Sequence, residues 1–316
     1  MRIALCCLSL FGALSLTSSL YAGESLRVAT YNLNNYLVMD RHVDNRWRPS
    51  YPKPENEKVI VRQNILRHAP DILALQEIGP LEFLEELRAD LAREGLHYTY
   101  AVHLEGPDPD RHLALLSKLP PKDVKKHTDL DFKYLEGRER VKRGMLEVAF
   151  DPGNGDVFKV FVVHLKSRYT VHKEDPDSEL RRLREAEACR NRIVERTREI
   201  GKDRFMVVGD FNDHPDSATM RRFYRRGDLD IGSLLPASDS RGDVWTYYYK
   251  KHGQYSLVDG FVLSDELFSD VNTGRAHIVD TPGTMIGSDH RMIYLDLDRG
   301  NSLQTAGHGS ESSSTN

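Results

Sequence analysis

The segment Val207-Val208-Gly209-Asp210-Phe211-Asn212 places an acid and an amide two residues apart at the end of an apolar run. In an extended strand, residues two apart point to the same face, so Asp210 and Asn212 are expected to project together. Asp210 can hold a proton or bind a cation, and Asn212 can donate hydrogen bonds. Polar residues of this kind at the end of a buried strand suggest an active site.

Polar residues follow other apolar segments of the chain in the same way. The full set is Asn32, Asn34, Glu77, His164, Asp210, Asn212, Asp259, Asp289 and His290. Carboxylates and amides with few His and no Cys fit a hard cation with oxygen ligands, so Mg²⁺ or Mn²⁺ is favoured over Zn²⁺. A histidine paired with a carboxylate has a raised pKa and a fixed ring orientation. Such a pair beside a metal ion could activate water and stabilise a phosphorane-like charge.

The apolar patterns predict the elements that carry these residues. Strands are expected near 26–33, 71–76, 112–117, 145–150, 157–165, 205–209, 256–263 and 290–296. Amphipathic helices are expected over 55–68, 81–91 and 178–200, the last with many Arg and Glu facing out and with Asp177 or Ser178 as its cap. Some strands follow helices and others follow one another directly. This mixture favours an α/β protein with two packed mixed β-sheets flanked by helices.

The composition is that of an ordinary globular protein. The 316 residues carry a formal charge of −4, so binding to a polyanion would need a local basic patch. Residues 1–22 combine one charge, an apolar run and small residues, which is typical of a signal peptide cleaved after Ala22. If uncleaved, the same run is long enough for a membrane anchor.

The rest of the chain is expected to form one domain over 23–298, followed by a disordered Ser- and Gly-rich tail over 299–316. Because residues 1–22 have the signal-peptide pattern, the protein is expected to be exported to the periplasm or the extracellular space. No protein partner is evident, and no stable membrane association is expected after cleavage.

Three segments keep more than one interpretation. Residues 40–54 hold Trp47, prolines and several charges, so they are expected to be irregular and could form part of a substrate rim. The run Trp245-Thr246-Tyr247-Tyr248-Tyr249 could stack nucleic-acid bases or could be a strand with packing aromatics, and the strand is favoured. Lys166 and Arg168 could be a solvated strand end or could contact phosphate.

Six short motifs occur in the order found in a known family. They are TYNLN (30–34), LALQEI (73–78), VVHLKS (162–167), VVGDFND (207–213), LVDGFVLS (257–264) and GSDHRM (287–292). In these motifs, which span most of the chain, the sequence resembles the endonuclease/exonuclease/phosphatase superfamily. The resemblance implies a deoxyribonuclease-I-like four-layer α/β sandwich and metal-dependent hydrolysis of a phosphoester bond.

The resemblance also implies a metal site that holds Mg²⁺ or Mn²⁺. Asn32 and Glu77 match metal ligands of the first two motifs, and Asp289 matches a further ligand. Asn34 stands where many members of the superfamily have Asp.

The remaining matches imply catalytic roles. Asp210 matches the residue that orients or deprotonates the attacking water, and Asn212 matches the amide that holds the phosphate or the oxyanion. His290 matches a general base or phosphate-binding histidine, and Asp259 matches the carboxylate that orients it.

Two further matches favour a nuclease among the activities of the superfamily. His164 matches a second histidine of deoxyribonuclease-like members, with Asp110 as a candidate acidic partner, and Arg143 matches a phosphate-binding Arg. We therefore expect an exported, Mg²⁺-dependent nuclease that cleaves DNA or RNA by water attack on a phosphodiester. The alternative is a sphingomyelinase-like phosphodiesterase or phosphatase acting on a lipid or inositol phosphate. A binding module without catalysis is the remote alternative.

Overall fold

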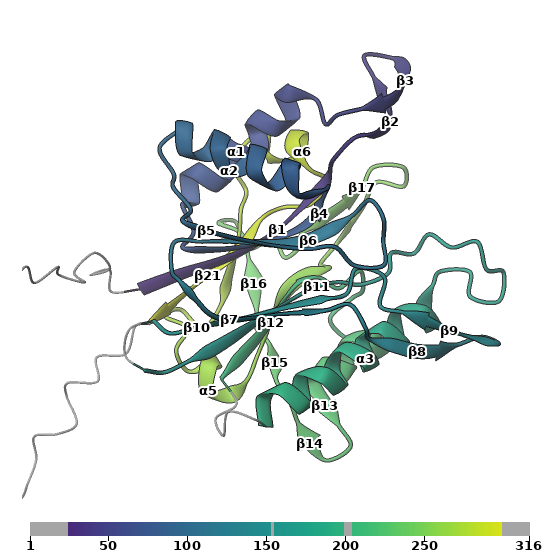
Figure 1. Cartoon of the computed structure of the whole chain (residues 1–316), viewed down its shortest axis with the longest axis vertical. Helices are drawn as coiled ribbons and strands as arrows, with labels where there is room; N and C mark the ends of the chain where they lie inside the picture. Colours follow the sequence, from purple (N-terminus) through teal and green to yellow (C-terminus); the bar gives the residue numbers. More distant parts are fainter. Residues whose placement is uncertain (1–24, 153–154, 199–203, 299–316) are drawn as a thin grey trace, which may run out of the picture.

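Two large mixed β-sheets stack face to face, and helices cover the outer face of each sheet (Figure 1). The computed structural model describes residues 25–152, 155–198 and 204–298. The first sheet has the order β16 (Ala237–Ser238), β20 (Ala276–Ile278), β21 (Ile293–Asp298), β1 (Ser25–Tyr36), β4 (Ile72–Ile78), β6 (His112–Ser117) and β5 (Tyr100–Leu104). The second has the order β15 (Ser233–Leu234), β19 (Asp259–Leu263), β12 (Phe205–Asp210), β11 (Phe158–His164), β10 (Met145–Phe150) and β7 (Pro121–His127).

Four two-stranded ribbons and six helices surround these sheets in the described part of the chain. The ribbons are β2 (Met39–Val43) with β3 (Arg46–Tyr51), β8 (Asp131–Tyr134) with β9 (Gly137–Arg140), β13 (Arg225–Arg226) with β14 (Leu229–Asp230), and β17 (Tyr247–Tyr249) with β18 (Gln254–Ser256). The helices are α1 (Glu55–His68), α2 (Leu81–Arg93), α3 (Glu179–Arg198), α4 (Ala218–Tyr224), α5 (Asp265–Phe268) and α6 (Thr284–Gly287). None of the helices in the described ranges combines the length and the apolar character needed to cross a membrane.

Three apolar layers hold the four layers of secondary structure together. The middle one lies between the sheets and includes Val28, Val148 and Val208. The outer faces of the two sheets pack against α1 and α2 on one side, and against α3 and α4 on the other. Because the central strands are buried on both faces, they read as continuous apolar runs rather than as alternating patterns. The expected α/β sandwich of two mixed sheets flanked by helices is confirmed.

The strand register brings polar residues together at one end of the second sheet. In the parallel pair β11–β12, His164 lies opposite Asp210, and in the antiparallel pair β12–β19, Asp210 lies opposite Asp259. Three residues that are far apart in sequence thus occupy neighbouring strand ends. In the first sheet, β1 and β4 run parallel with Asn32 opposite Gln76, which sets Glu77 at the corresponding end of that sheet.

Two local expectations were wrong. Residues 40–54 were expected to be irregular, but most of them form the β2–β3 hairpin, whose strands pair from Met39–Tyr51 to Val43–Arg46. Helix α3 is not capped by Asp177 or Ser178. Instead, Asp175 accepts the backbone N–H groups of Leu180 and Arg181, both at 3.0 Å. Asp175 can cap the helix although it is further from the helix start in sequence, because the chain turns back between Asp175 and the first residue of α3.

The eight expected strands and three expected helices are confirmed, with ends that differ by a few residues. The expected signal peptide, 1–22, and the expected tail, 299–316, lie outside the described residues. The strands β10 and β11 follow one another directly and pair antiparallel, from Leu146–Val162 to Phe150–Phe158. Cys189 is fully buried in the apolar layer under α3, where it packs as a small apolar residue.

Gly209 should tolerate no side chain. Its φ is +134°, and an added Cβ would lie 2.0 Å from the carbonyl oxygen of Val163 on β11. We expect Gly209→Ala to lower the free energy of unfolding by roughly 2–6 kcal/mol, because it combines backbone strain with overpacking. The matched control is Gly137→Ala, whose nearest neighbouring atom lies 4.0 Å from the new Cβ. Urea unfolding of both variants measures the difference, and equal midpoints would contradict the close approach of the two strands.

Candidate active site

The site is organised around Asp210, which ends β12 with its side chain buried between the two sheets. Its Oδ2 accepts hydrogen bonds from Nδ2 of Asn32, at 3.0 Å, and from Nδ2 of Asn212, at 3.1 Å. Its Oδ1 accepts the backbone N–H of Asn212 at 2.8 Å. Asn32 belongs to the first sheet, so this carboxylate joins the two sheets at the site.

Asn212 orients Asp210 in this structure. Besides donating to Asp210, its Nδ2 donates to the carbonyl of Leu165 at 2.9 Å. Both amide hydrogens are therefore engaged within the protein. The phosphate-holding role that the resemblance implies for Asn212 stays a prediction, and the structure shows it as a positioning residue.

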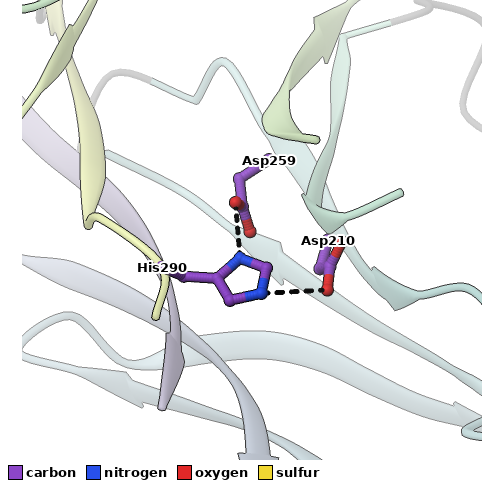
Figure 2. Close-up of side chains that lie close together, drawn as sticks. All are labelled: Asp210, Asp259 and His290. Carbon is purple, nitrogen blue, oxygen red and sulfur yellow. Dashed lines mark hydrogen bonds and ion pairs between the residues drawn. The ribbon is translucent and has the colours of Figure 1, made fainter. Parts of the chain in front are cut away.

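Asp259 and His290 form the second part of the site (Figure 2). Nδ1 of His290 lies 2.8 Å from Oδ2 of Asp259, and Nε2 lies 3.9 Å from Oδ2 of Asp210. The backbone supports this orientation, because the N–H of His290 donates to Oγ of Ser288, which itself donates to the carbonyl of Asn32. The imidazole is thus fixed with one nitrogen on Asp259 and the other directed at Asp210.

The charges in this group shift the pKa values in opposite directions. Burial raises the pKa of Asp210 to about 7, although the charge of His290 opposes that shift. Burial alone would lower the pKa of His290, but the carboxylates of Asp259 and Asp210 outweigh it and raise the pKa well above its ordinary value. A carboxyl group near neutrality beside a positively charged imidazole is suited to accept a proton from water.

His164 lies on the other side of Asp210 and is neutral. Burial lowers its pKa well below the ordinary value, and the charges of Arg143 and His290 lower it further. Its Nε2 is 3.4 Å from Oδ2 of Asp210 and 3.7 Å from Oε1 of Glu77. The expected partner Asp110 is exposed and forms no such contact, so that pairing was wrong.

Arg143 provides a buried cation beside His164. Its Nε lies 3.2 Å from Oδ2 of Asp108, and Nε and Nη1 have no hydrogen-bond partner in the described part of the chain. A buried guanidinium with spare donors is suited to a phosphate oxygen. Asp108 also accepts the backbone N–H groups of Asp110 and Arg111 through Oδ1, which fixes the orientation of its carboxylate.

Asn32, Glu77 and Asp289 are the candidate metal ligands, and their side chains offer two carboxylates and one amide oxygen. Burial raises the pKa of Asp289, and the negative charge of Glu77 raises it further, so these carboxylates repel each other. A divalent cation would relieve this repulsion, and two carboxylates with an amide oxygen form a donor set suited to Mg²⁺ or Mn²⁺. The residues present therefore fit such an ion.

A second grouping could also hold a metal ion. Ligand atoms of Asp210, Asp259 and His290 all lie within 4.8 Å of one another. In that group, however, Oδ2 of Asp259 and Nδ1 of His290 are occupied by their mutual hydrogen bond. This arrangement favours proton transfer there and metal binding at Glu77 and Asp289.

The loop that carries these ligands has an unusual backbone. Asn34, Asn35, Glu77 and Asn212 have positive φ values between 47° and 59°. The β-ladders of β1 and β4 shift register at Asn34–Asn35 and at Glu77, which indicates bulges. Non-glycine residues in this region are strained, and such strain is typical of functional sites. The N–H of Asn35 donates to Oε2 of Glu77 at 2.9 Å, so the bulge orients a candidate metal ligand.

Three basic residues that support the site were missed by the sequence analysis. Lys53 is buried and donates to the carbonyl of Asn34 at 3.0 Å, and Arg41 donates to the carbonyl of Asn35. Arg182 was expected on a solvated helix face, but it is 3% exposed and pairs with Asp213 at 3.0 Å. Periodicity could not identify these residues, because their partners are loop groups brought near only by the fold.

An aromatic wall extends from His290 into a pocket of about 680 Å³. The ring centroids of His290 and Tyr247 are 4.7 Å apart, those of Tyr247 and Tyr249 are 6.4 Å apart, and those of Tyr249 and His252 are 5.1 Å apart. The pocket is also lined by Ser167, Arg168, Tyr169 and Asn212. It therefore joins the catalytic group to a surface suited to a flat ring.

Residues 245–249 were interpreted either as a strand with packing aromatics or as a surface for base stacking. The structure shows packing aromatics at some of these positions and pocket-lining aromatics at others. The favoured strand is present as β17, and Trp245 and Tyr248 pack on Tyr255 with centroid distances of 4.7 and 4.6 Å. Tyr247 and Tyr249 instead face the pocket. Lys166 is buried, and its ammonium group bonds backbone carbonyls of the following loop, whereas Arg168 is exposed at the pocket.

Solved structures similar to this chain share its fold. A protein of the endonuclease/exonuclease/phosphatase family from Bacteroides vulgatus is 17% identical, with 87% of this chain and 98% of that chain covered and a TM-score of 0.60. The human Nocturnin catalytic domain is 17% identical over 86% of this chain and 94% of its own, with a TM-score of 0.58. Sphingomyelinase C from Streptomyces griseocarneus is 15% identical over 87% and 99%, with a TM-score of 0.57.

No curated protein is significantly similar to this chain in sequence, but a family model is. The model of the Endonuclease/Exonuclease/phosphatase family matches residues 29–290, a range that begins before Asn32 and ends at His290. With the strand ends, the buried Asp–His group and the candidate metal ligands all inside the matched range, this chain belongs to the endonuclease/exonuclease/phosphatase family.

Proposed function

We propose that this protein is an exported, divalent-metal-dependent phosphodiesterase whose substrate is nucleic acid. Members of the family are generally hydrolases that act on phosphodiester bonds. The observation that carries the proposal is the buried Asp210, held by two amides and flanked by a neutral His164 and a positively charged His290. Export is proposed from the signal-peptide pattern of residues 1–22.

The proposed reaction is in-line attack of water on the phosphorus atom. Asp210 accepts the proton of the water as its oxygen bonds to phosphorus, and the bond to the leaving oxygen breaks. Arg143 and the imidazolium of His290 donate hydrogen bonds to the phosphate oxygens, where negative charge develops. The leaving oxygen takes up a proton from His290 or from solvent. A Mg²⁺ or Mn²⁺ ion held by Asn32, Glu77 and Asp289 would neutralise phosphate charge.

The aromatic wall supports nucleic acid over other phosphodiesters. A strand whose phosphate reaches Asp210 could place the neighbouring base against Tyr247 and Tyr249, and stacking of a base on an aromatic ring contributes about 1–3 kcal/mol. Arg168, exposed on the same pocket, could contact the adjoining phosphate.

Removing either member of the proton-transfer pair should stop the chemistry without unfolding the protein. We expect Asp210→Asn and His290→Ala each to lower kcat by roughly a hundredfold or more, which is the usual scale of general-base loss. The matched control, Asp228→Asn, changes an exposed carboxylate in the turn between β13 and β14 and should keep wild-type turnover. Steady-state kinetics, with circular dichroism to check folding, measure this. Near-wild-type kcat in either variant would show that its role is wrongly assigned.

Metal removal should abolish activity reversibly. We expect EDTA to stop hydrolysis and excess Mg²⁺ or Mn²⁺ to restore it, because the candidate metal ligands fit a hard cation. Mg²⁺ should also raise the thermal unfolding temperature of the wild type. Glu77→Gln should reduce that rise, while Glu266→Gln, an exposed acid on α5, should not. Full activity in EDTA would remove metal dependence from the proposal.

Nucleic acid should be cleaved and lipid should not. We expect the purified protein to nick or degrade plasmid DNA or RNA with Mg²⁺, and to lose this cleavage in EDTA or with Asp210→Asn. Release of phosphocholine from sphingomyelin vesicles, assayed in parallel, tests the lipid alternative. Vesicle hydrolysis that needs Asp210, without cleavage of any nucleic acid, would replace nucleic acid by a lipid headgroup as the substrate.

A further inference from the structure

The β2–β3 hairpin has two faces of different chemistry. It leaves the end of β1 and projects from the body of the molecule, at the upper right of Figure 1. Its register pairs Arg41 with Arg48, Val43 with Arg46, and His42 with Trp47. Directly opposed residues share a face and neighbours along a strand alternate, so Arg41, Arg46 and Arg48 lie on one face. We call these three residues the arginine face; His42 and Trp47 lie on the other.

The arginine face carries positive charge that the protein does not neutralise. Like charges directly opposite each other on a ribbon are destabilising, yet Arg41 and Arg48 form such a pair. Neither Arg46 nor Arg48 has an ion-pair partner in the described ranges. The guanidinium of Arg48 lies over the ring of Tyr51, with Cζ 5.4 Å from its centroid, and its Nε is buried without a hydrogen-bond partner. Asp40, the nearest acid on β2, instead accepts the N–H of Ser50. This arrangement indicates an anionic partner.

The arginine face leads to the catalytic group. Arg41, at its base, donates to the carbonyls of Asn35 and Leu37, next to the N–H that holds Glu77. The charge of Arg111 lowers the pKa of both Arg41 and His164, so Arg111 is near both residues. The base of the arginine face therefore lies close to the loop that carries the candidate metal ligand Glu77.

We propose that the arginine face binds the phosphate backbone of a nucleic-acid strand several nucleotides away from the bond that is cleaved. This inference rests on the proposed function, since it assigns a further binding surface for the same substrate. An extended polyanion can contact Arg46, Arg48 and the catalytic group together, whereas a single small phosphoester cannot. A lipid surface fits less well, because the hairpin turns at Asp44-Asn45, which are polar, and Trp47 lies on the opposite face.

The consequence is a dependence of catalysis on substrate length. The double variant Arg46→Ala/Arg48→Ala tests this, and Arg41 is left intact because it holds the site loop. We expect kcat/KM on a long single-stranded oligonucleotide to fall about tenfold or more, while a dinucleotide, too short to reach the hairpin, is cleaved as by the wild type. The slope of log KM against log salt concentration should decrease by about 1.4, from two lost phosphate contacts.

The matched control removes the same charge from other surfaces. Arg67→Ala/Arg226→Ala changes two exposed arginines, on α1 and on β13, and should keep the wild-type length dependence and salt slope. Equal length dependence in the hairpin variant and the wild type would overturn the inference. So would a hairpin variant that loses only binding to anionic phosphatidylserine vesicles.

Direct binding separates this inference from the proposed function. Fluorescence anisotropy with a labelled oligonucleotide measures binding to the Asp210→Asn protein, with and without the hairpin changes. If binding depends on the hairpin but the wild type cleaves no nucleic acid, the proposed function fails and the binding surface stands. If the Asp210→Asn protein does not bind the oligonucleotide at all, the inference fails as well.

Discussion

The site depends on one buried carboxylate that is shared between two sheets. Burying Asp210 is unfavourable unless hydrogen bonds and a positive charge compensate for the lost water. Asn32 from the first sheet, Asn212 from the loop after β12, and the positively charged His290 supply that compensation. Burial raises the pKa of this carboxyl group, and the charge of His290 and the N–H of Asn212 limit that rise, so the pKa is about 7. Stability of the interface and reactivity of the site therefore have a common origin.

This arrangement places strict demands on the sheets. His164, Asp210 and Asp259 lie side by side only in one strand register, because a shift of one residue would turn every side chain to the opposite face. Gly209 lets β12 pass close to Val163 directly before the carboxylate, and a larger residue would separate the strands there. The large apolar layer between the sheets makes such movement costly, since packed interiors deform little. The rigid sheets thus keep the side chains of the catalytic group at fixed distances from one another.

The catalytic group and the surfaces around it have different functions. The catalytic group around Asp210 holds the side chains that a phosphodiester hydrolase needs, and these needs do not depend on the groups that the phosphate joins. The surfaces around this group include the hairpin with Arg46 and Arg48 and the wall of Tyr247 and Tyr249. Loops and ribbons around a rigid scaffold commonly set substrate choice within one fold. The catalytic group supports hydrolysis as the reaction, and the surrounding arginine and tyrosine side chains support nucleic acid as the substrate.

Local patterns in the sequence predicted the main strands and helices, the layered α/β class and the polar strand ends. Apolar periodicity is local, and motifs such as VVGDFND carry both a strand and its functional end. Only the tertiary structure decided which polar groups meet. Arg143 pairs with Asp108, Arg182 is buried on Asp213, and residues 39–51 form a ribbon with an arginine face. These contacts join groups whose separation in space is set by sheet packing and loop paths, which a local pattern does not encode.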